Sequence, residues 1–247
     1  MDRLGVLLLS LRDMKRFFLI VFSAALCCCG CGQRGGAASS TAASSEDRLQ
    51  AQDSIRKGDL LFVGIPGDYY LSDTLFEAGQ IPVTYIHASM LDVDEEGLWV
   101  VDATFKHGVD RHRLDTLVAD FKLRNDRHLT LEVWRVKDLP EVDQCVETAK
   151  FHLGLPYDIS FVPGNDEWYC TELIQDAYTY PDGRRIFSNR GLNFESGSIS
   201  ERDYWQRLFS RIGAEAPAGV EGTTPRSLME EGCIYKLDID PYIYLNK

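Results

Sequence analysis

The chain has 247 residues, of which 45% are apolar and 26% charged, a composition typical of a folded domain with a sizeable core. Its formal net charge of −12 argues against non-specific nucleic-acid binding, because no basic excess is present to neutralise phosphates. The chain has seven cysteines, and an odd count argues against a framework of disulfides. Four of them are clustered between Cys27 and Cys31, whereas Cys145, Cys170 and Cys233 are scattered.

The N-terminal residues have the layout of an export signal. Met14–Arg16 is a short positive region, and Phe17–Leu26 is an apolar run too short to serve as a stable membrane anchor. The segment before Met14 adds nothing to this layout. We therefore predict that residues 1–31 are a signal peptide and that Met14 is the true start.

The cysteine cluster follows Leu26 directly and resembles the lipobox of bacterial lipoproteins, in which the lipidated cysteine becomes the new N-terminus. Cys29 fits this motif because Leu26 lies three residues before it, and Cys31 fits because Gly30 precedes it. We therefore predict that Cys29, or else Cys31, is lipidated. A metal-binding cluster is the weaker alternative, because no histidine lies nearby.

Residues 32–50 are rich in glycine, serine and alanine, and we predict that they form a flexible tether to a folded domain of residues 51–247. Residues 1–29 hold four basic and two acidic side chains, so the rest of the chain carries a net charge of −14. An acidic domain is not attracted to anionic lipid, so the lipid anchor must supply the attachment.

The domain alternates between strand and helix patterns, which predicts a single α+β fold. The expected strands are Leu60–Val63, Val83–Leu91, Leu98–Ala103, Leu129–Val136 and Ile234–Ile239. The expected helices are Ser72–Glu77, Leu114–Leu123, Pro140–Leu153, Glu167–Ala177, Tyr204–Ile212 and Thr224–Glu231. The charged stretch around His107 and His112 is expected to be solvated, and Phe187–Ser198 is expected to be a surface loop.

Cys170 is the strongest candidate for a reactive group, because it lies at the expected start of a helix. A helix N-terminus favours the thiolate, and its N–H groups can stabilise an oxyanion. A nucleophilic cysteine also needs a base and an orienting acceptor. The second and third strands are expected to form an antiparallel hairpin with His87 on one arm and Asp102 on the other, so this pair can supply both.

The alternative for Cys170 is that of a small buried packing residue, which is the commoner role of a lone cysteine. Cys145 and Cys233 illustrate it, since Cys145 falls in the middle of a helix and Cys233 has no helical lead-in. The chain has no paired CxxC motif in its body, no HExxH motif and no glycine-rich phosphate loop. We therefore expect no metal and no organic cofactor.

Five segments occur in a characteristic order: Gly58–Phe62, the residues around His87, Val101–Ala103, Leu153–Asp158 and Tyr169–Leu173. Together they resemble the YiiX/YebB-like branch of the NlpC-type cysteine hydrolases, from about Gly58 to Tyr180 and more loosely at Pro225–Leu228. The resemblance implies a circularly permuted papain-like fold, which is a single α+β domain with an antiparallel sheet and helices. Permutation also explains why the histidine precedes the cysteine.

Carried over to this sequence, the resemblance implies that Cys170 is the nucleophile, His87 the general base and Asp102 the orienting residue. Tyr169, Tyr157 and Glu172 are expected near the substrate, although a role within the helix is equally open for Glu172.

This sequence departs from the family pattern at three places, none of which removes a member of the triad. Ile86, Ala88 and Ser89 replace the usual neighbours of the histidine. Asp102 replaces a glutamate and is one methylene shorter, and Thr171 replaces a serine.

These features predict a lipid-anchored cysteine hydrolase of the bacterial cell envelope that cleaves an amide bond through an acyl-enzyme. Its expected partners are a cell-wall peptide or another amide-containing substrate and the membrane that holds its anchor. Two alternatives stay open: a lipid acyltransferase or thioesterase of the same fold, and an envelope binding module that has lost turnover.

Overall fold

The computed structural model describes residues 54–66, 83–124, 126–139, 141–195 and 199–245. The predicted signal peptide, the lipidation sites Cys29 and Cys31, the tether and the expected helix Ser72–Glu77 lie outside these residues. Within the described ranges, no helix combines the length and the apolar character needed to cross a membrane.

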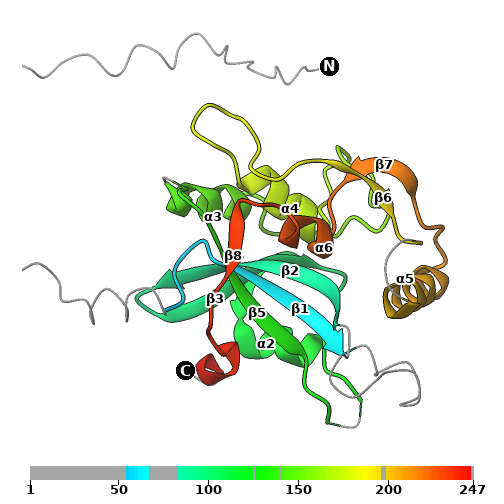
Figure 1. The fold of residues 1–247 in the computed structure, drawn as a ribbon, viewed down its shortest axis with the longest axis horizontal. Helices are drawn as coiled ribbons and strands as arrows, with labels where there is room; N and C mark the ends of the chain where they lie inside the picture. Colours follow the sequence, from blue (N-terminus) through cyan, green and yellow to red (C-terminus); the bar gives the residue numbers. More distant parts are fainter. Residues whose placement is uncertain (1–53, 67–82, 125, 140, 196–198, 246–247) are drawn as a thin grey trace, which may run out of the picture. The chain divides into compact units, whose positions relative to one another are not determined.

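An antiparallel sheet of six strands forms the centre of the domain, in the order β4-β3-β2-β1-β5-β8 (Figure 1). The strands are β1 (Leu60–Pro66), β2 (Val83–Asp94), β3 (Gly97–Thr104), β4 (Gly108–Arg113), β5 (Thr130–Val136) and β8 (Ile234–Lys236). Each strand expected from the sequence is present, and β2 and β3 form the expected hairpin.

The strand β4 corrects the expectation that its charged stretch is solvated. It pairs with β3 over six residues, from Gly108 opposite Thr104 to Arg113 opposite Trp99. Gly108 makes the connecting turn possible, because its φ of +68° is strained for other residues and a Cβ there would lie 2.3 Å from the Leu155 carbonyl oxygen. An edge strand tolerates charged residues, which is why the apolar pattern gives no sign of it.

Both faces of the sheet are covered, and the alternation along β1 shows how. Leu60 and Phe62 belong to one apolar cluster, whereas Leu61 and Val63 belong to a second cluster on the opposite face. The first cluster packs against α3 (Val142–Lys150), α4 (Cys170–Ala177) and α6 (Pro225–Met229), and the second against α2 (Leu114–Asp120) and the 3₁₀ helix η4 (Pro241–Tyr244). In Figure 1, α3, α4 and α6 accordingly lie on one side of the sheet and α2 on the other.

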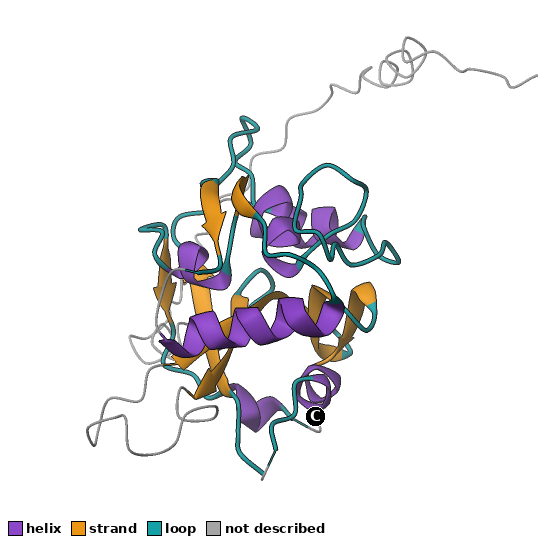
Figure 2. Cartoon of the chain, turned by 90° about the vertical axis from the view of Figure 1, so that its right-hand side faces the viewer, coloured by secondary structure: helices purple, strands orange, loops and turns teal. Residues whose placement is uncertain are grey.

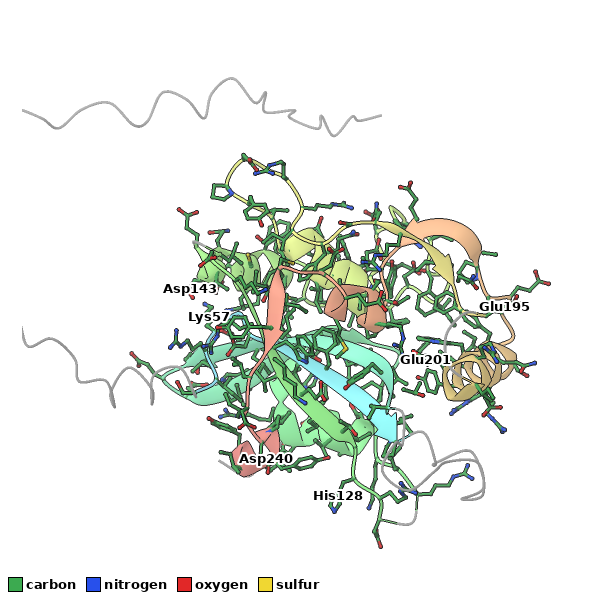
Figure 3. All side chains as sticks on the ribbon, viewed as in Figure 1. Lys57, His128, Asp143, Glu195, Glu201 and Asp240 are labelled. Atoms are coloured by element: carbon green, nitrogen blue, oxygen red, sulfur yellow. The ribbon has the colours of Figure 1, made fainter. Side chains whose placement is uncertain are left out.

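A third apolar cluster lies beyond the main sheet. It joins the helix α5 (Ile199–Ile212), the long helix that faces the viewer in Figure 2, to a small sheet of β6 (Arg190–Asn193) and β7 (Ala218–Gly222). Glu201 of α5, labelled in Figure 3, accepts a hydrogen bond of 2.6 Å from Arg226 Nε of α6.

The segment Phe187–Ser198 is therefore only partly the surface loop expected from its glycine and serine content. It contains β6, and its apolar side chains Phe187, Leu192 and Phe194 are buried. Composition did not reveal this, because the partners that bury these side chains are distant in the sequence.

The Gly58-Asp59 motif has a structural role that connects β1 to the helices. Gly58 has a φ of +82°, and its carbonyl oxygen accepts a hydrogen bond of 2.6 Å from the buried Tyr178 hydroxyl after α4. The Asp59 carboxylate accepts two hydrogen bonds, of 2.6 and 2.8 Å, from the guanidinium of Arg135 on β5. The motif thus fixes the start of β1 beneath the helix that carries Cys170.

Candidate active site

Cys170 is the first residue of α4, as its sequence context predicts. Tyr169 is the N-cap residue in extended conformation, and its side chain does not cap the helix. The backbone N–H groups of the first turn have no partners within the helix and lie beside Cys170. Its thiol is free and only 5% exposed, and it lies in the wall of a large cavity.

His87 and Asp102 meet across the β2–β3 hairpin. His87 Nε2 lies 2.7 Å from Asp102 Oδ2, and Ser89 Oγ donates a hydrogen bond of 3.1 Å to the same oxygen. All three residues are buried. The register that pairs Met90 with Val101 leaves His87 diagonal to Asp102, and diagonal neighbours on adjacent antiparallel strands are within reach of long side chains. The shorter aspartate therefore reaches the imidazole without the methylene of the glutamate usual in the family.

A β-bulge lies beside His87. Val63 of β1 pairs with His87 but Gly64 pairs with Tyr85, so Ile86 is the extra residue on β2. Bulges bend a strand and redirect its side chains, and they are common next to active sites. The ring of Phe121, at the end of α2, packs 4.8 Å from the imidazole of His87 and restricts its orientation.

The imidazole of His87 hydrogen-bonds to Cys170 as well as to Asp102. Burial by itself lowers the pKa of His87, but the electrostatic interactions and hydrogen bonds with Cys170 and Asp102 outweigh it and raise the pKa. For Asp102, burial by itself raises the pKa, but the charges of and hydrogen bonds from His87 and His112 outweigh it, so the pKa is lowered. The arrangement therefore favours a protonated His87.

The cavity in front of Cys170 and His87 has a volume of about 1210 Å³. Aromatic side chains, among them Tyr157, Phe161 and Trp205, form part of its wall. Six basic side chains also line it, and Asp120 is the single carboxylate among its described lining residues; the basic residues are Lys106, Lys122, Arg124, Arg127, Arg207 and Arg211. A cationic cavity on a chain of net charge −12 is a local feature that composition conceals.

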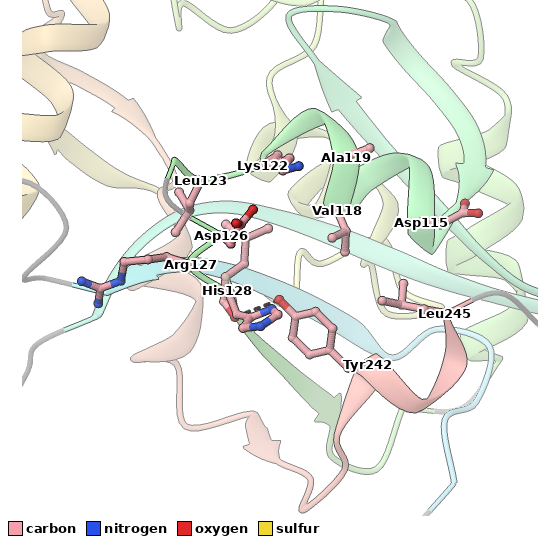
Figure 4. A pocket seen from close by; sticks show the side chains of 11 residues that line it. Asp115, Val118, Ala119, Lys122, Leu123, Asp126, Arg127, His128, Tyr242 and Leu245 are labelled. Carbon is pink, nitrogen blue, oxygen red and sulfur yellow. Dashed lines mark hydrogen bonds between the residues drawn. The ribbon is translucent and has the colours of Figure 1, made fainter.

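A second hollow, of about 340 Å³, lies between α2 and η4 (Figure 4). His128 and Tyr242 line it, and the Tyr242 hydroxyl donates a hydrogen bond of 3.0 Å to the Leu129 carbonyl. Neither Cys170 nor His87 contributes to this hollow, so the larger cavity is the one associated with the candidate site.

The three residues expected near the substrate have different positions. Tyr157 and Tyr169 both line the cavity. Tyr157 stacks on Phe105, with ring centres 4.2 Å apart, and the Tyr169 hydroxyl accepts a hydrogen bond of 3.2 Å from the Thr223 backbone N–H.

Glu172 does not line the cavity. It is the third residue of α4, and its carboxylate accepts a hydrogen bond from the Tyr169 N–H, the half of a capping box that a glutamate supplies. Burial raises the pKa of Glu172 to about 7 despite this hydrogen bond. Its position thus favours the helix role over contact with substrate.

His112 is the residue that sequence reasoning missed. The charged stretch around it predicts a solvated side chain, yet His112 is only 7% exposed, and its Nε2 lies 3.0 Å from Asp102 Oδ1. His107 does lie at the surface, where it pairs with Asp120. Local sequence does not reveal this burial, because it depends on the register that places His112 of β4 opposite Val100 of β3.

The other two cysteines of the domain are remote from this network. Cys145 is buried in the middle of α3, and burial raises its pKa. Cys233 is half-buried before β8, and burial raises its pKa as well. Neither lines the cavity.

Comparison with known proteins gives matches to a family model, a curated relative and a solved structure. The model of the permuted papain-like amidase enzyme, YaeF/YiiX, C92 family, matches residues 54–237. The uncharacterized protein YiiX of Escherichia coli strain K12 is 28% identical over 87 residues, which make up 35% of this chain and 42% of the relative. The match thus spans less than half of that relative.

A crystal structure of the metalloprotein YiiX from Escherichia coli O157:H7 has a TM-score of 0.51 and 21% sequence identity. The match covers 75% of this chain and 97% of that one, which shows a shared fold. In the part of this chain that the structure describes, no group of three or more His, Cys, Asp or Glu side chains is arranged to hold a metal ion.

Proposed function

The chain belongs to the permuted papain-like amidases of the YaeF/YiiX type, the C92 family, and from this membership we propose that it is a cysteine hydrolase of the cell envelope that cleaves an amide bond. Cys170 is the nucleophile, His87 the general acid and base, and Asp102 the orienting residue. The observation that carries this proposal is that Cys170, at a helix N-terminus, and His87, bound to Asp102, face the same large cavity.

The geometry supports a two-step acyl transfer. The Cys170 thiolate attacks the amide carbonyl carbon, and the first-turn N–H groups of α4 stabilise the resulting oxyanion. The protonated His87 then donates its proton to the leaving amine as the carbon–nitrogen bond breaks, which leaves a thioester. Neutral His87 accepts a proton from water, the resulting hydroxide attacks the thioester, and release of the acid restores the thiolate.

A peptide with free carboxylates, such as a cell-wall stem peptide, matches the chemistry of the cavity. The basic side chains of the cavity come from two separate parts of the fold, the segment from Lys106 to Arg127 and the helix α5. Several separated cations suit a ligand with several separated negative charges. Such charges raise the local concentration of an anionic substrate, and this effect weakens as salt is added.

The proposed location is the bacterial envelope, with the domain held to a membrane by lipid on Cys29 or Cys31. The support is the sequence alone: a short export signal, a lipobox-like cluster and a polar tether. Mass spectrometry of the mature N-terminus tests this, with a lipid-modified cysteine at position 29 or 31 as the expected result. An unmodified N-terminus anywhere else contradicts the anchor.

The activity is tested by offering the purified protein peptidoglycan fragments and phospholipid vesicles in parallel. We expect new amine and carboxylate termini from the peptides, a rate that falls with added salt, and no turnover by Cys170→Ala. Release of fatty acid without peptide cleavage would instead favour the lipid acyl-transfer alternative. A folded protein that turns over neither substrate and whose Cys170 fails to react with a thiol probe near pH 7 would favour the binding module.

A further inference from the structure

Asp102 is held by a second histidine that no part of the proposed triad requires. His112 lies on the edge strand β4, and the register places it on the same face of the sheet as Asp102, because Val100 pairs with His112 and Asp102 with Asp110. Its Nε2 lies 3.0 Å from Asp102 Oδ1, the carboxylate oxygen opposite the one that faces His87. A carboxylate thus lies between two buried imidazoles.

The contacts of His112 determine its protonation. Nδ1 lies 3.1 Å from the Arg113 carbonyl oxygen, and Nε2 faces the Asp102 carboxylate. A carbonyl oxygen and a carboxylate are both acceptors, whereas a neutral imidazole carries only one N–H. Both contacts are hydrogen bonds only when both ring nitrogens carry protons, so the geometry requires an imidazolium at His112.

The charged groups around His112 agree with this assignment. Burial alone lowers the pKa of His112, but the hydrogen bond and charge of Asp102, the Arg113 carbonyl and the charge of Asp110 raise it. The ring centre of His107 lies 6.2 Å from that of His112, and His107 is itself bound to Asp120. On the other side of Asp102, the titratable groups facing His87 are Asp102 and Cys170.

We propose that His112 is a positioning residue of the active site, which holds Asp102 in place and, as an imidazolium, weakens the hold of Asp102 on the His87 proton. This inference rests on the proposed roles of Cys170 and His87. Asp102 Oδ2 is already occupied by His87 and Ser89, so the contact of His112 with Oδ1 prevents the carboxylate from turning.

The cation has a consequence for the reaction. His87 must keep its proton beside the thiolate and then release it to the leaving amine. A bare carboxylate next to His87 favours retention of the proton, and a positive charge on the far side of that carboxylate opposes it. Without the charge of His112 the pKa of His87 is higher. The fall in reaction rate at high pH that accompanies loss of the His87 proton, which is the alkaline limb of the pH profile, then moves to higher pH.

The test compares His112→Gln, which keeps an N–H donor for Asp102 but loses the charge, with the wild type. The matched control is His107→Gln, which removes the neighbouring histidine that does not contact Asp102. The readout is the rate at which iodoacetate alkylates Cys170 in the full-length chain, resolved by mass mapping at each pH. Because the reagent is an anion, its rate falls when His87 loses its proton, so the alkaline limb reports His87 independently of any substrate.

We expect the midpoint of the alkaline fall in alkylation rate to rise by about one pH unit in His112→Gln. The reason is the loss of a positive charge on the side of Asp102 that faces away from His87. We expect no shift in His107→Gln. An unshifted midpoint in His112→Gln overturns the inference while leaving the triad intact, since a purely structural role would change the rate without moving the limb. A wild-type profile with no alkaline limb overturns the proposed function itself.

A second measurement tests the inference even if the variant fails to fold. ¹⁵N NMR of the histidine rings in the wild-type protein distinguishes protonated from unprotonated ring nitrogens. Two protonated nitrogens at His112 at pH 7 support the inference, and one unprotonated nitrogen overturns it.

Discussion

Cys170 and Cys145 lie on adjacent helices, α4 and α3, which cover the same face of the sheet, and the two are almost equally buried, with exposed fractions of 5% and 4%. Cys145 is in the middle of its helix and packs into the apolar cluster. Cys170 begins its helix, contacts His87 and faces the cavity. Burial alone therefore does not decide the chemistry of these two thiols, which depends on their position along the helix and on the neighbouring side chains.

The largest difference between the two cysteines is expected when each is exchanged for alanine. Cys170→Ala should reduce amide hydrolysis at least about a thousandfold, because the nucleophile is lost. Cys145→Ala should keep the rate within about twofold and lower the free energy of unfolding by about 1 kcal/mol, because it removes a buried sulfur. Initial rates and thermal unfolding measure the two effects. Equal loss of activity in both variants would contradict the assignment.

Asp102→Asn should make Cys170 resemble Cys145 more closely without touching either thiol. The amide cannot accept from both histidines, because its NH₂ group must face one of them, so His87 loses its orientation and its pKa falls. We expect the hydrolysis rate to fall by about a hundredfold or more, with a parallel loss of Cys170 alkylation at pH 6.

The matched control is Asp92→Asn. Asp92 is a second buried carboxylate of the same sheet; it lies on β2 and pairs with Arg111. This substitution should lower stability while leaving the pH profile of the folded protein unchanged. If it moves the profile as far as Asp102→Asn does, the effect is one of general sheet stability.

Glu172→Gln should have the smallest effect, which is on the stability of the protein. It tests the role of Glu172 in supporting α4 separately from the reaction at Cys170. The folded-state pKa of Glu172 is raised to about 7, so its contribution to stability is largest at low pH and is lost as pH rises towards 7. Glutamine removes the cost of burying an ionised carboxylate and still accepts a hydrogen bond from the Tyr169 N–H. At pH 8 the variant should therefore unfold at a higher temperature than the wild type, with a free energy of unfolding about 1–2 kcal/mol larger. At pH 4 its free energy of unfolding should be almost the same as that of the wild type. A gain of the same size at both pH values would show that burial of the charge is not its cause.

Local patterns in the sequence account for much of the candidate site. Helical spacing and an aromatic lead-in located Cys170 at the start of α4, and two apolar runs around an acidic turn predicted the hairpin that brings His87 and Asp102 together. These features depend on neighbours within about twenty residues, which is the range over which periodicity and turn chemistry act. Ordered family motifs then indicated the permuted papain-like fold.

Local spacing in the sequence is therefore enough to assign the family, to place Cys170 at the start of its helix and to pair the two strands of the hairpin. The folded structure adds three features: a bulge beside His87, a paired edge strand in the charged segment from Gly108 to Arg113, and six basic side chains that line one cavity. It also placed Glu172 against its own helix and His112 against Asp102. These outcomes depend on strand register and on contacts between distant segments, where a shift of one residue turns a buried histidine to the opposite face.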